Sequence, residues 1–171
     1  MRTILFSALL TISTVALSQT SSISLNQETF CQELSEIIDY SENYFDDIIG
    51  DLISTDTSGS TSIDYYASDW SFTDLPEGYV EDYLSELTFM LDIGYSSESN
   101  KLSQPYEYLL TMIKQCLGSE WTVHDESPSE SLAKGVYFQR EKDENLGPEV
   151  GLAIFKDGDE YWLQLAIYPP L

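Results

Sequence analysis

The 171-residue sequence contains 30 Asp and Glu residues but only seven Lys and Arg residues, which gives a formal net charge of −23 at pH 7. Proteins bind nucleic-acid phosphates and anionic lipid headgroups through Lys and Arg, so this composition argues against nucleic acid and membrane surfaces as partners. It favours cations and basic proteins instead.

The first 18 residues resemble a bacterial signal peptide. Arg2 precedes an apolar stretch over residues 4–17, and Ala16 and Ser18 place small residues at the −3 and −1 positions of a cleavage site. The stretch is shorter than the roughly 20 apolar residues that a membrane span needs. We therefore expect cleavage after Ser18 and export of a single acidic domain, residues 19–171, to the periplasm or the medium.

The acidic residues are unevenly distributed. Between Arg2 and Lys101 the chain has no Lys or Arg, although 18 Asp and Glu residues fall in that interval. Loss of Arg2 with the signal peptide lowers the net charge to −24. We expect an acidic face built from residues 36–98, which would bind a basic protein or a divalent cation. The alternative is an acidic surface that serves only to keep the chain hydrated and soluble.

Cys31 and Cys116 are the only cysteines. In an exported chain, such a pair predicts one intramolecular disulfide. The bridge would close a loop of about 85 residues, and on the chain-entropy model this stabilises the fold by about 4–5 kcal/mol. A structural zinc site would need histidine ligands as well, and the chain has one His.

Residues 28–49 show the clearest helical pattern. Asn26 is placed to cap the helix, and Gly50 lies where the pattern ends. Acidic residues are largely opposite the apolar ones, which recur at steps of three and four: Phe30, Leu34, Ile37, Ile38, Ser41, Phe45, Ile48, Ile49 and Leu52.

Three strands are predicted in the middle of the chain, at residues 63–72, 79–84 and 87–95. The apolar residues from Val80 to Leu91 also fit a helix. Alternation and the β-branched and aromatic side chains favour strands over this segment.

A second helix is predicted at residues 104–117, with Ser103 or Gln104 as its cap and Pro105 in its first turn. Gly118 is suited to end it. Apolar residues then alternate with period two in four runs: residues 121–123, 136–140, 150–155 and 161–167.

Asp157-Gly158 separates the last two runs and predicts a tight hairpin turn. The elements together predict an α+β domain, in which two helices pack on one face of a mostly antiparallel sheet with a C-terminal β-meander.

The common catalytic motifs are absent from the sequence, which has no phosphate-binding glycine loop, G-x-S-x-G, H-E-x-x-H or C-x-x-C. His124 is the only histidine, and Asp125 and Glu126 follow it. These carboxylates could orient an imidazole, but a solvent-facing histidine on a strand explains the same pattern. The absence of these motifs argues against the common enzyme classes, although not against all enzymes, and we favour a protein that is not an enzyme.

Acidic and aromatic residues are interleaved over residues 64–74. Asp64, Tyr66, Asp69, Trp70 and Asp74 are the candidate ligand-binding residues. Aromatic rings stack on sugar rings, and two carboxylates about 5–10 Å apart can hydrolyse a glycosidic bond. The alternative interpretation is that the aromatic residues belong to the core.

Asp46, Asp47 and Asp51 form a candidate calcium site near the end of the first predicted helix. Carboxylates at a helix C-terminus oppose the helix dipole, and a bound cation would relieve this. Hydrated surface acids explain the same cluster. No other cofactor is indicated.

These observations favour an exported, non-enzymatic binding or interaction module with an acidic face. The alternative is a small carboxylate-dependent hydrolase that acts on carbohydrate or cell-wall material.

Overall fold

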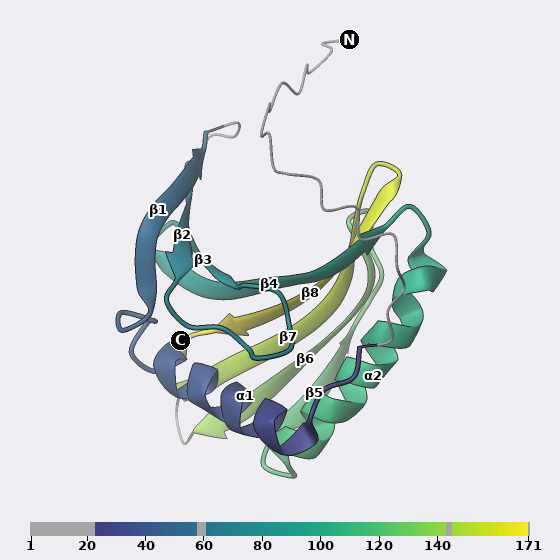
Figure 1. Ribbon diagram of the computed structural model, residues 1–171, viewed down its shortest axis with the longest axis horizontal. Helices are drawn as coiled ribbons and strands as arrows, with labels where there is room; N and C mark the ends of the chain where they lie inside the picture. Colours follow the sequence, from purple (N-terminus) through teal and green to yellow (C-terminus); the bar gives the residue numbers. More distant parts are fainter. Residues whose placement is uncertain (1–22, 58–60, 143–144, 171) are drawn as a thin grey trace.

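Two helices and eight strands make up the part of the chain that the computed structural model describes, residues 23–57, 61–142 and 145–170 (Figure 1). The strands form one antiparallel sheet in the order β1-β2-β3-β4-β8-β7-β6-β5. The predicted α+β fold is confirmed. The predicted signal peptide and its cleavage site lie outside the described residues.

Each half of the chain consists of a helix followed by four strands. The first half comprises α1 (Gln27–Ser41), β1 (Ile49–Asp56), β2 (Ile63–Ser68), β3 (Tyr79–Tyr83) and β4 (Glu86–Ser96). The second comprises α2 (Ser99–Leu117), β5 (Thr122–Glu126), β6 (Leu132–Lys142), β7 (Asn145–Asp157) and β8 (Glu160–Tyr168).

The two halves meet where β4 pairs with β8. Both are the last strands of their halves, and they run antiparallel, so the halves are related as by a two-fold axis between them. The sequence shows no repeat that would predict this arrangement.

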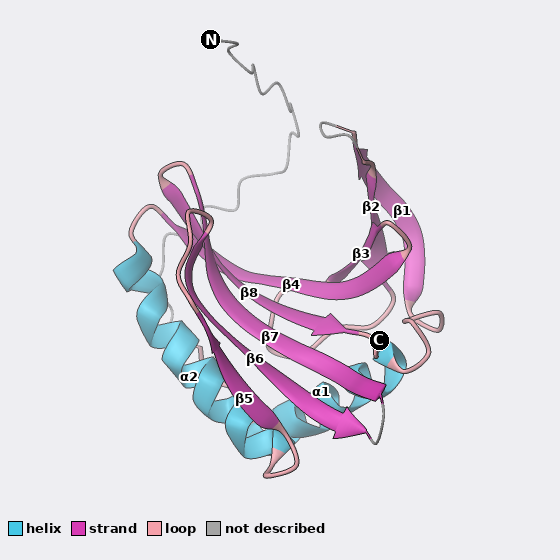
Figure 2. Ribbon diagram, turned by 180° about the vertical axis from the view of Figure 1, so that it is seen from behind, coloured by secondary structure: helices cyan, strands magenta, loops and turns pink. Residues whose placement is uncertain are grey.

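Both helices lie on the same face of the sheet (Figure 2). One row of buried residues crosses the sheet beneath them, because each member is paired directly with the next: Val80, Phe89, Ile167, Val150 and Phe138. Helix α1 contacts α2 and β8, and α2 contacts β4, β7 and β8. The core therefore lies between the helices and one face of the sheet. Neither of the described helices is long and apolar enough to span a membrane.

Helix α1 begins as predicted, with the Asn26 side chain accepting a hydrogen bond from the Thr29 N–H at 3.1 Å. It ends at Ser41, so the prediction that it continues to residue 49 is wrong. Residues 42–48 form turns, and Phe45 has a positive φ of 59°. Phe45 and Ile48 are buried in the core through these turns, which is why their spacing resembled a helix.

The sequence did not predict β1. Its first residue, Ile49, was assigned to the helix, and no element was predicted for the rest of it. Six of its eight residues are exposed, so it lacks the alternation of buried and exposed residues that identifies a half-buried strand.

The other elements are present where they were predicted, with different bounds: β2 ends at Ser68 rather than residue 72, and β6, β7 and α2 are each longer than predicted. Helix α2 begins at Ser99 rather than residue 104, so Pro105 lies inside it. The extension buries Leu102 on the same stripe as Tyr106 and Leu109. In the meander, Gly158 takes a φ of 57° at the tight turn between β7 and β8.

The predicted disulfide is present. Cys31 and Cys116 are joined, with their Cα atoms 4.9 Å apart. The bridge connects the first turns of α1 to the last turn of α2, and therefore ties the two halves of the chain together on the helix side of the sheet.

We predict that replacing both cysteines by serine lowers the free energy of unfolding by up to about 4–5 kcal/mol, because the unfolded chain regains the entropy of the closed loop. Urea denaturation of the double variant and of the oxidised wild type measures this difference. Reduced wild type is the control and should match the double variant. Equal stability of the oxidised and reduced proteins would contradict the prediction.

Candidate functional site

The aromatic members of the ligand-binding group predicted at residues 64–74 pack against the core. The Trp70 ring lies edge-on to Phe72 and Phe89, with ring centroids 4.8 and 5.8 Å apart. Its indole N–H donates to Glu36 on α1 at 3.4 Å. Tyr66 is half-buried against the same core.

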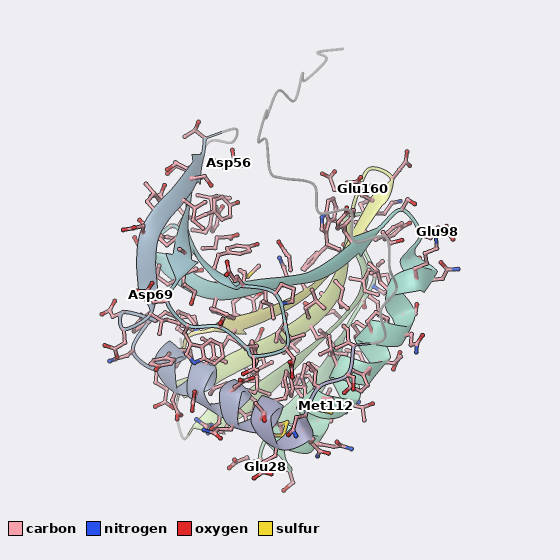
Figure 3. All side chains as sticks on the ribbon, viewed as in Figure 1. Glu28, Asp56, Asp69, Glu98, Met112 and Glu160 are labelled. Atoms are coloured by element: carbon pink, nitrogen blue, oxygen red, sulfur yellow. A yellow bond between two sulfur atoms is a disulfide. The ribbon has the colours of Figure 1, made fainter. Side chains whose placement is uncertain are left out.

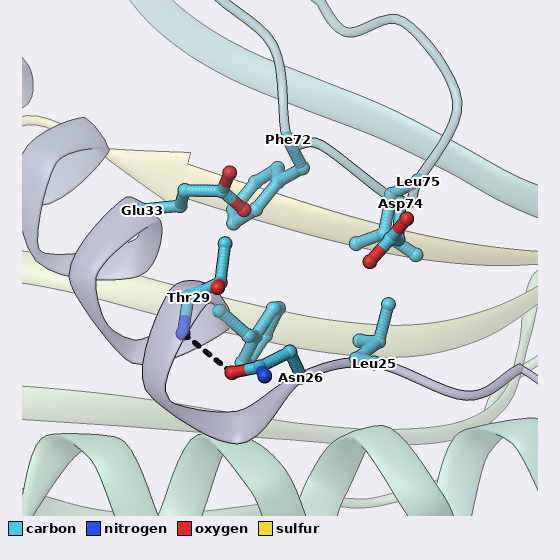
Figure 4. A pocket seen from close by; sticks show the side chains of 8 residues that line it. Leu25, Asn26, Thr29, Glu33, Phe72, Asp74 and Leu75 are labelled. Carbon is cyan, nitrogen blue, oxygen red and sulfur yellow. Dashed lines mark hydrogen bonds between the residues drawn. The ribbon is translucent and has the colours of Figure 1, made fainter.

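The acidic members of that group are dispersed. Asp64 accepts a hydrogen bond from the Thr55 hydroxyl at 2.6 Å on neighbouring strands. Asp69 lies beside β1 (Figure 3), where its backbone N–H donates to Ile48. Asp74 borders a small hollow of about 10 Å³ next to Asn26 at the start of α1 (Figure 4). That space holds one water molecule at most.

The candidate calcium residues lie at the start of the sheet. Asp46 and Asp47 are in the turns after α1, and Asp51 is on β1; all three are exposed. Among the described residues there is no group of three or more His, Cys, Asp or Glu side chains that could hold a metal ion. Calcium binding remains a prediction of the sequence.

The sheet face opposite the helices holds a different set of polar and aromatic side chains. Residues paired directly across strands point to the same side, so the register identifies the side chains that point away from the core. We call this surface the helix-free face, and it includes Tyr65, Tyr79, Glu81, Thr88, Met90 and Asp92 on β2–β4 and His124, Glu126, Tyr137, Gln139, Glu149, Gln164 and Tyr168 on β5–β8.

The sheet is curved around this face. The β1–β2 and β7–β8 hairpins rise at its two sides, where Figure 3 labels Asp56 and Glu160. Two glycines on this face let neighbouring side chains pack close to the backbone. A Cβ on Gly135 would lie 2.6 Å from a Glu126 carboxylate oxygen, and one on Gly151 would lie 3.4 Å from the Tyr168 ring.

A cavity of about 140 Å³ lies at one end of the helix-free face. Thr88 from β4, Gln139 from β6, Glu149 from β7 and Tyr168 from β8 are among the residues that line it. Because these strands come from both halves of the chain, the cavity exists only in the complete fold.

Burial raises the pKa of both Glu81 and Glu149, which are half-buried on this face. The neighbouring Asp92 adds to the effect on Glu81 and Glu126 adds to that on Glu149, whereas His124 acts in the opposite direction on Glu149. A neighbouring negative charge disfavours the ionised form of a carboxyl group, which is why it raises the pKa values of Glu81 and Glu149.

Several of these carboxylates also raise the pKa of the Tyr168 hydroxyl. Burial, together with the carboxylates of Glu149, Glu126 and Glu81, raises its pKa to about 12. These carboxylates come from β7, β5 and β3, so charges remote in the sequence act on one phenol.

Hydrogen bonds and ring contacts order the face. The Gln164 amide donates to Asp92 at 2.8 Å, and the Tyr79 hydroxyl donates to the same carboxylate at 3.5 Å. On the other half of the face, the His124 ring stacks on Tyr137 with centroids 4.6 Å apart.

Every Lys and Arg whose side chain the structure describes lies on a helix or on the helix side of the sheet. Lys134 pairs with Glu107 on α2, and Arg140 pairs with Glu42 at 3.1 Å. The full set is Lys101 and Lys114 on α2, and Lys134, Arg140 and Lys156 on the helix side of β6 and β7. His124 is therefore the only basic group among the described side chains of the helix-free face.

The sequence contained part of the signal for this site. Alternation over residues 79–83 places Tyr79 and Glu81 opposite the apolar Val80. It could not show that Glu81 and Glu149 share a face, because the register between remote strands is not encoded in local periodicity.

In comparisons with known proteins, no family model, curated protein or solved structure matches this chain. The functional argument therefore depends on the residues of the helix-free face.

We predict that the protein becomes less stable as the pH rises above 4.5, the ordinary pKa of a glutamate carboxyl group. An acid whose pKa is raised in the folded state contributes stability that is complete below the unfolded pKa and is lost as pH rises through the folded pKa. The E81Q and E149Q variants should show a shallower loss of unfolding free energy, measured by denaturant titration at several pH values.

The E28Q variant is the control for general charge repulsion, because Glu28 is exposed on α1 (Figure 3). It should retain the wild-type pH dependence. If E81Q and E149Q change the slope no more than E28Q does, these two carboxyls do not cause it.

Proposed function

We propose that this protein is an exported, non-enzymatic binding module whose helix-free face accepts a basic segment of a partner protein. The disulfide supports export, because such bonds persist in oxidising compartments. The observation that carries the proposal is the separation of charge across the sheet, with Glu81, Asp92, Glu126 and Glu149 on a face whose described side chains include no Lys or Arg.

The burial of two of these carboxylates favours a binding role over a purely solubilising one. Acids that serve solubility are fully hydrated, whereas Glu81 and Glu149 are half-buried and carry raised pKa values. Maintaining them costs stability at neutral pH. A bound ammonium or guanidinium group would offset that cost by pairing with them.

The tyrosines of the face suit the same partner. Tyr65 and Tyr79 lie edge-on to each other with centroids 5.9 Å apart, and Tyr168 borders the cavity beside Glu149. Aromatic faces attract Lys and Arg side chains, and tyrosine supplies contact area at protein interfaces.

We predict that a decalysine peptide binds the mature protein and raises its melting temperature, because a ligand that binds only the folded state stabilises it. Affinity should fall steeply with salt above roughly 0.15 M, where the screening length is about 8 Å. The E81Q/E149Q double variant should bind about tenfold more weakly, a loss of about 1.4 kcal/mol. Fluorescence anisotropy at fixed ionic strength measures both effects.

The matched control is the E28Q/D39N double variant, which removes the same charge from exposed positions of α1. It should bind decalysine within about twofold of wild type, since rim and remote charges act mainly on association rate. Equal weakening by both double variants would show that net charge alone attracts the peptide. Calcium chloride that stabilises the protein beyond matched sodium chloride would favour the divalent cation instead.

A second function has one observation in its favour. Glu81 beside Asp92, and Glu149 beside Glu126, each place a carboxyl with a raised pKa next to a second carboxylate. A hydrolase needs such a pair as general acid and base. Release of reducing sugar from cell-wall polysaccharide by wild type, and its loss in E149Q, would favour this carboxylate-dependent hydrolase over the binding module.

A further inference from the structure

Strand β1 forms one edge of the sheet and, in the described part of the chain, pairs only with β2. An edge strand presents backbone N–H and C=O groups that can pair with another extended chain. We propose that the basic partner binds here as an added strand, in an extended conformation alongside β1. This inference rests on the proposed function and specifies how the partner is held.

Two apolar side chains of β1 are exposed to solvent. Leu52 and Ile53 are 55% and 60% exposed, although they are adjacent and both strongly apolar. Leu52 is paired with Tyr66, on the helix side of the sheet. An added strand would cover this apolar surface and would satisfy the outward backbone groups at the same time.

The edge is not blocked by positive charge or proline. Natural edge strands are commonly protected by Lys or Pro, and the sequence of β1 contains neither. Its charged residues are Asp51 and Asp56. The register with β2 shifts around Leu52 and then runs without a shift from Ser54 to Asp56, which leaves a regular edge at that end.

The acidic residues on and next to β1 favour a basic segment over a second copy of this chain. Two copies of this chain paired through β1 would bring Asp51, Asp56 and the adjacent Asp64 of each copy together, on a protein whose net charge is −23. A basic segment would instead meet opposite charge. Asp56 is paired with Ile63, which is paired with Tyr83. This row of residues lies next to the row formed by Tyr65 and Glu81 and points to the same side of the sheet. Basic side chains on that side of the added strand would therefore adjoin the helix-free face.

The partner segment should therefore alternate basic and apolar residues, with the basic ones toward the helix-free face and the apolar ones toward Leu52. The probe is a labelled octapeptide of alternating lysine and valine. Two further versions carry N-methyl groups on all lysine amides or on all valine amides. In an extended strand these two sets of N–H groups point to opposite edges, so only one methylated version should lose binding.

The I53K variant places a positive charge and a long side chain on the edge, and it should weaken octapeptide binding at least about tenfold. The matched control is V123K, because Val123 is an apolar residue, 41% exposed, on β5 at the opposite edge. It should bind within about twofold of wild type. Circular dichroism and thermal melting establish that both variants fold.

Equal binding of the two methylated peptides, or equal affinity of I53K, V123K and wild type, would overturn strand addition. If E81Q/E149Q still weakens binding in that case, the proposed function stands without it. Failure of every basic peptide to bind would overturn both proposals. A glutamate–valine octapeptide that binds as well as the lysine–valine one, or dimerisation of the protein that I53K abolishes, would also overturn the choice of a basic occupant.

Discussion

Both helices pack on the same face of one antiparallel sheet, and this one-sided burial governs the rest of the structure. Alternation along each strand sends every second side chain to the helices, where Phe89, Leu91, Leu152 and Leu165 are fully buried. The remaining side chains must face water or a ligand. A sheet of eight strands thus presents a broad second surface that does not pack against the helices, and its polar side chains are free to serve another purpose.

The distribution of charge follows from the same constraint. On the helix side, Lys134 forms an ion pair with Glu107 of α2, and Arg140 forms one with Glu42 in the segment after α1. These exposed pairs each contribute little stability. The acids on the opposite face have no Lys or Arg neighbour among the described side chains, and His124 is the one basic group there. Glu81 and Glu149 are then held close to Asp92 and Glu126, which is an arrangement that folding alone does not favour.

Most of the architecture could be predicted from the sequence, because helices and half-buried strands have distinct periods. The start of α1, the C-terminal meander and the disulfide were predicted correctly. The end of α1 was wrong because Phe45 and Ile48 reach the core through turns, at a spacing that resembles a helix. Strand β1 was missed because an exposed edge has no alternation to detect.

The helix-free face was the hardest feature to predict. Trp70 and Tyr66 drew attention as aromatic residues among acids, and the structure packs both against the core. The face depends instead on the pairing of β4 with β8, which joins residues more than 70 positions apart, such as Asp92 and Gln164. Such contacts depend on global topology, and no local pattern specifies them.

The two-fold relation between the halves has a further consequence for how this fold could be built. A chain with only one helix and four strands would expose its last strand as an open edge, and two copies could close that edge by pairing with each other. Pairing of β4 with β8 does the same within one chain, and the Cys31–Cys116 bridge fastens the two units on the helix side. In a symmetric dimer, the surfaces on the two sides of the axis are necessarily identical. In a single chain, the two halves can carry different residues. Here one half contributes Tyr79 and Asp92 to the helix-free face, and the other contributes His124 and Tyr137.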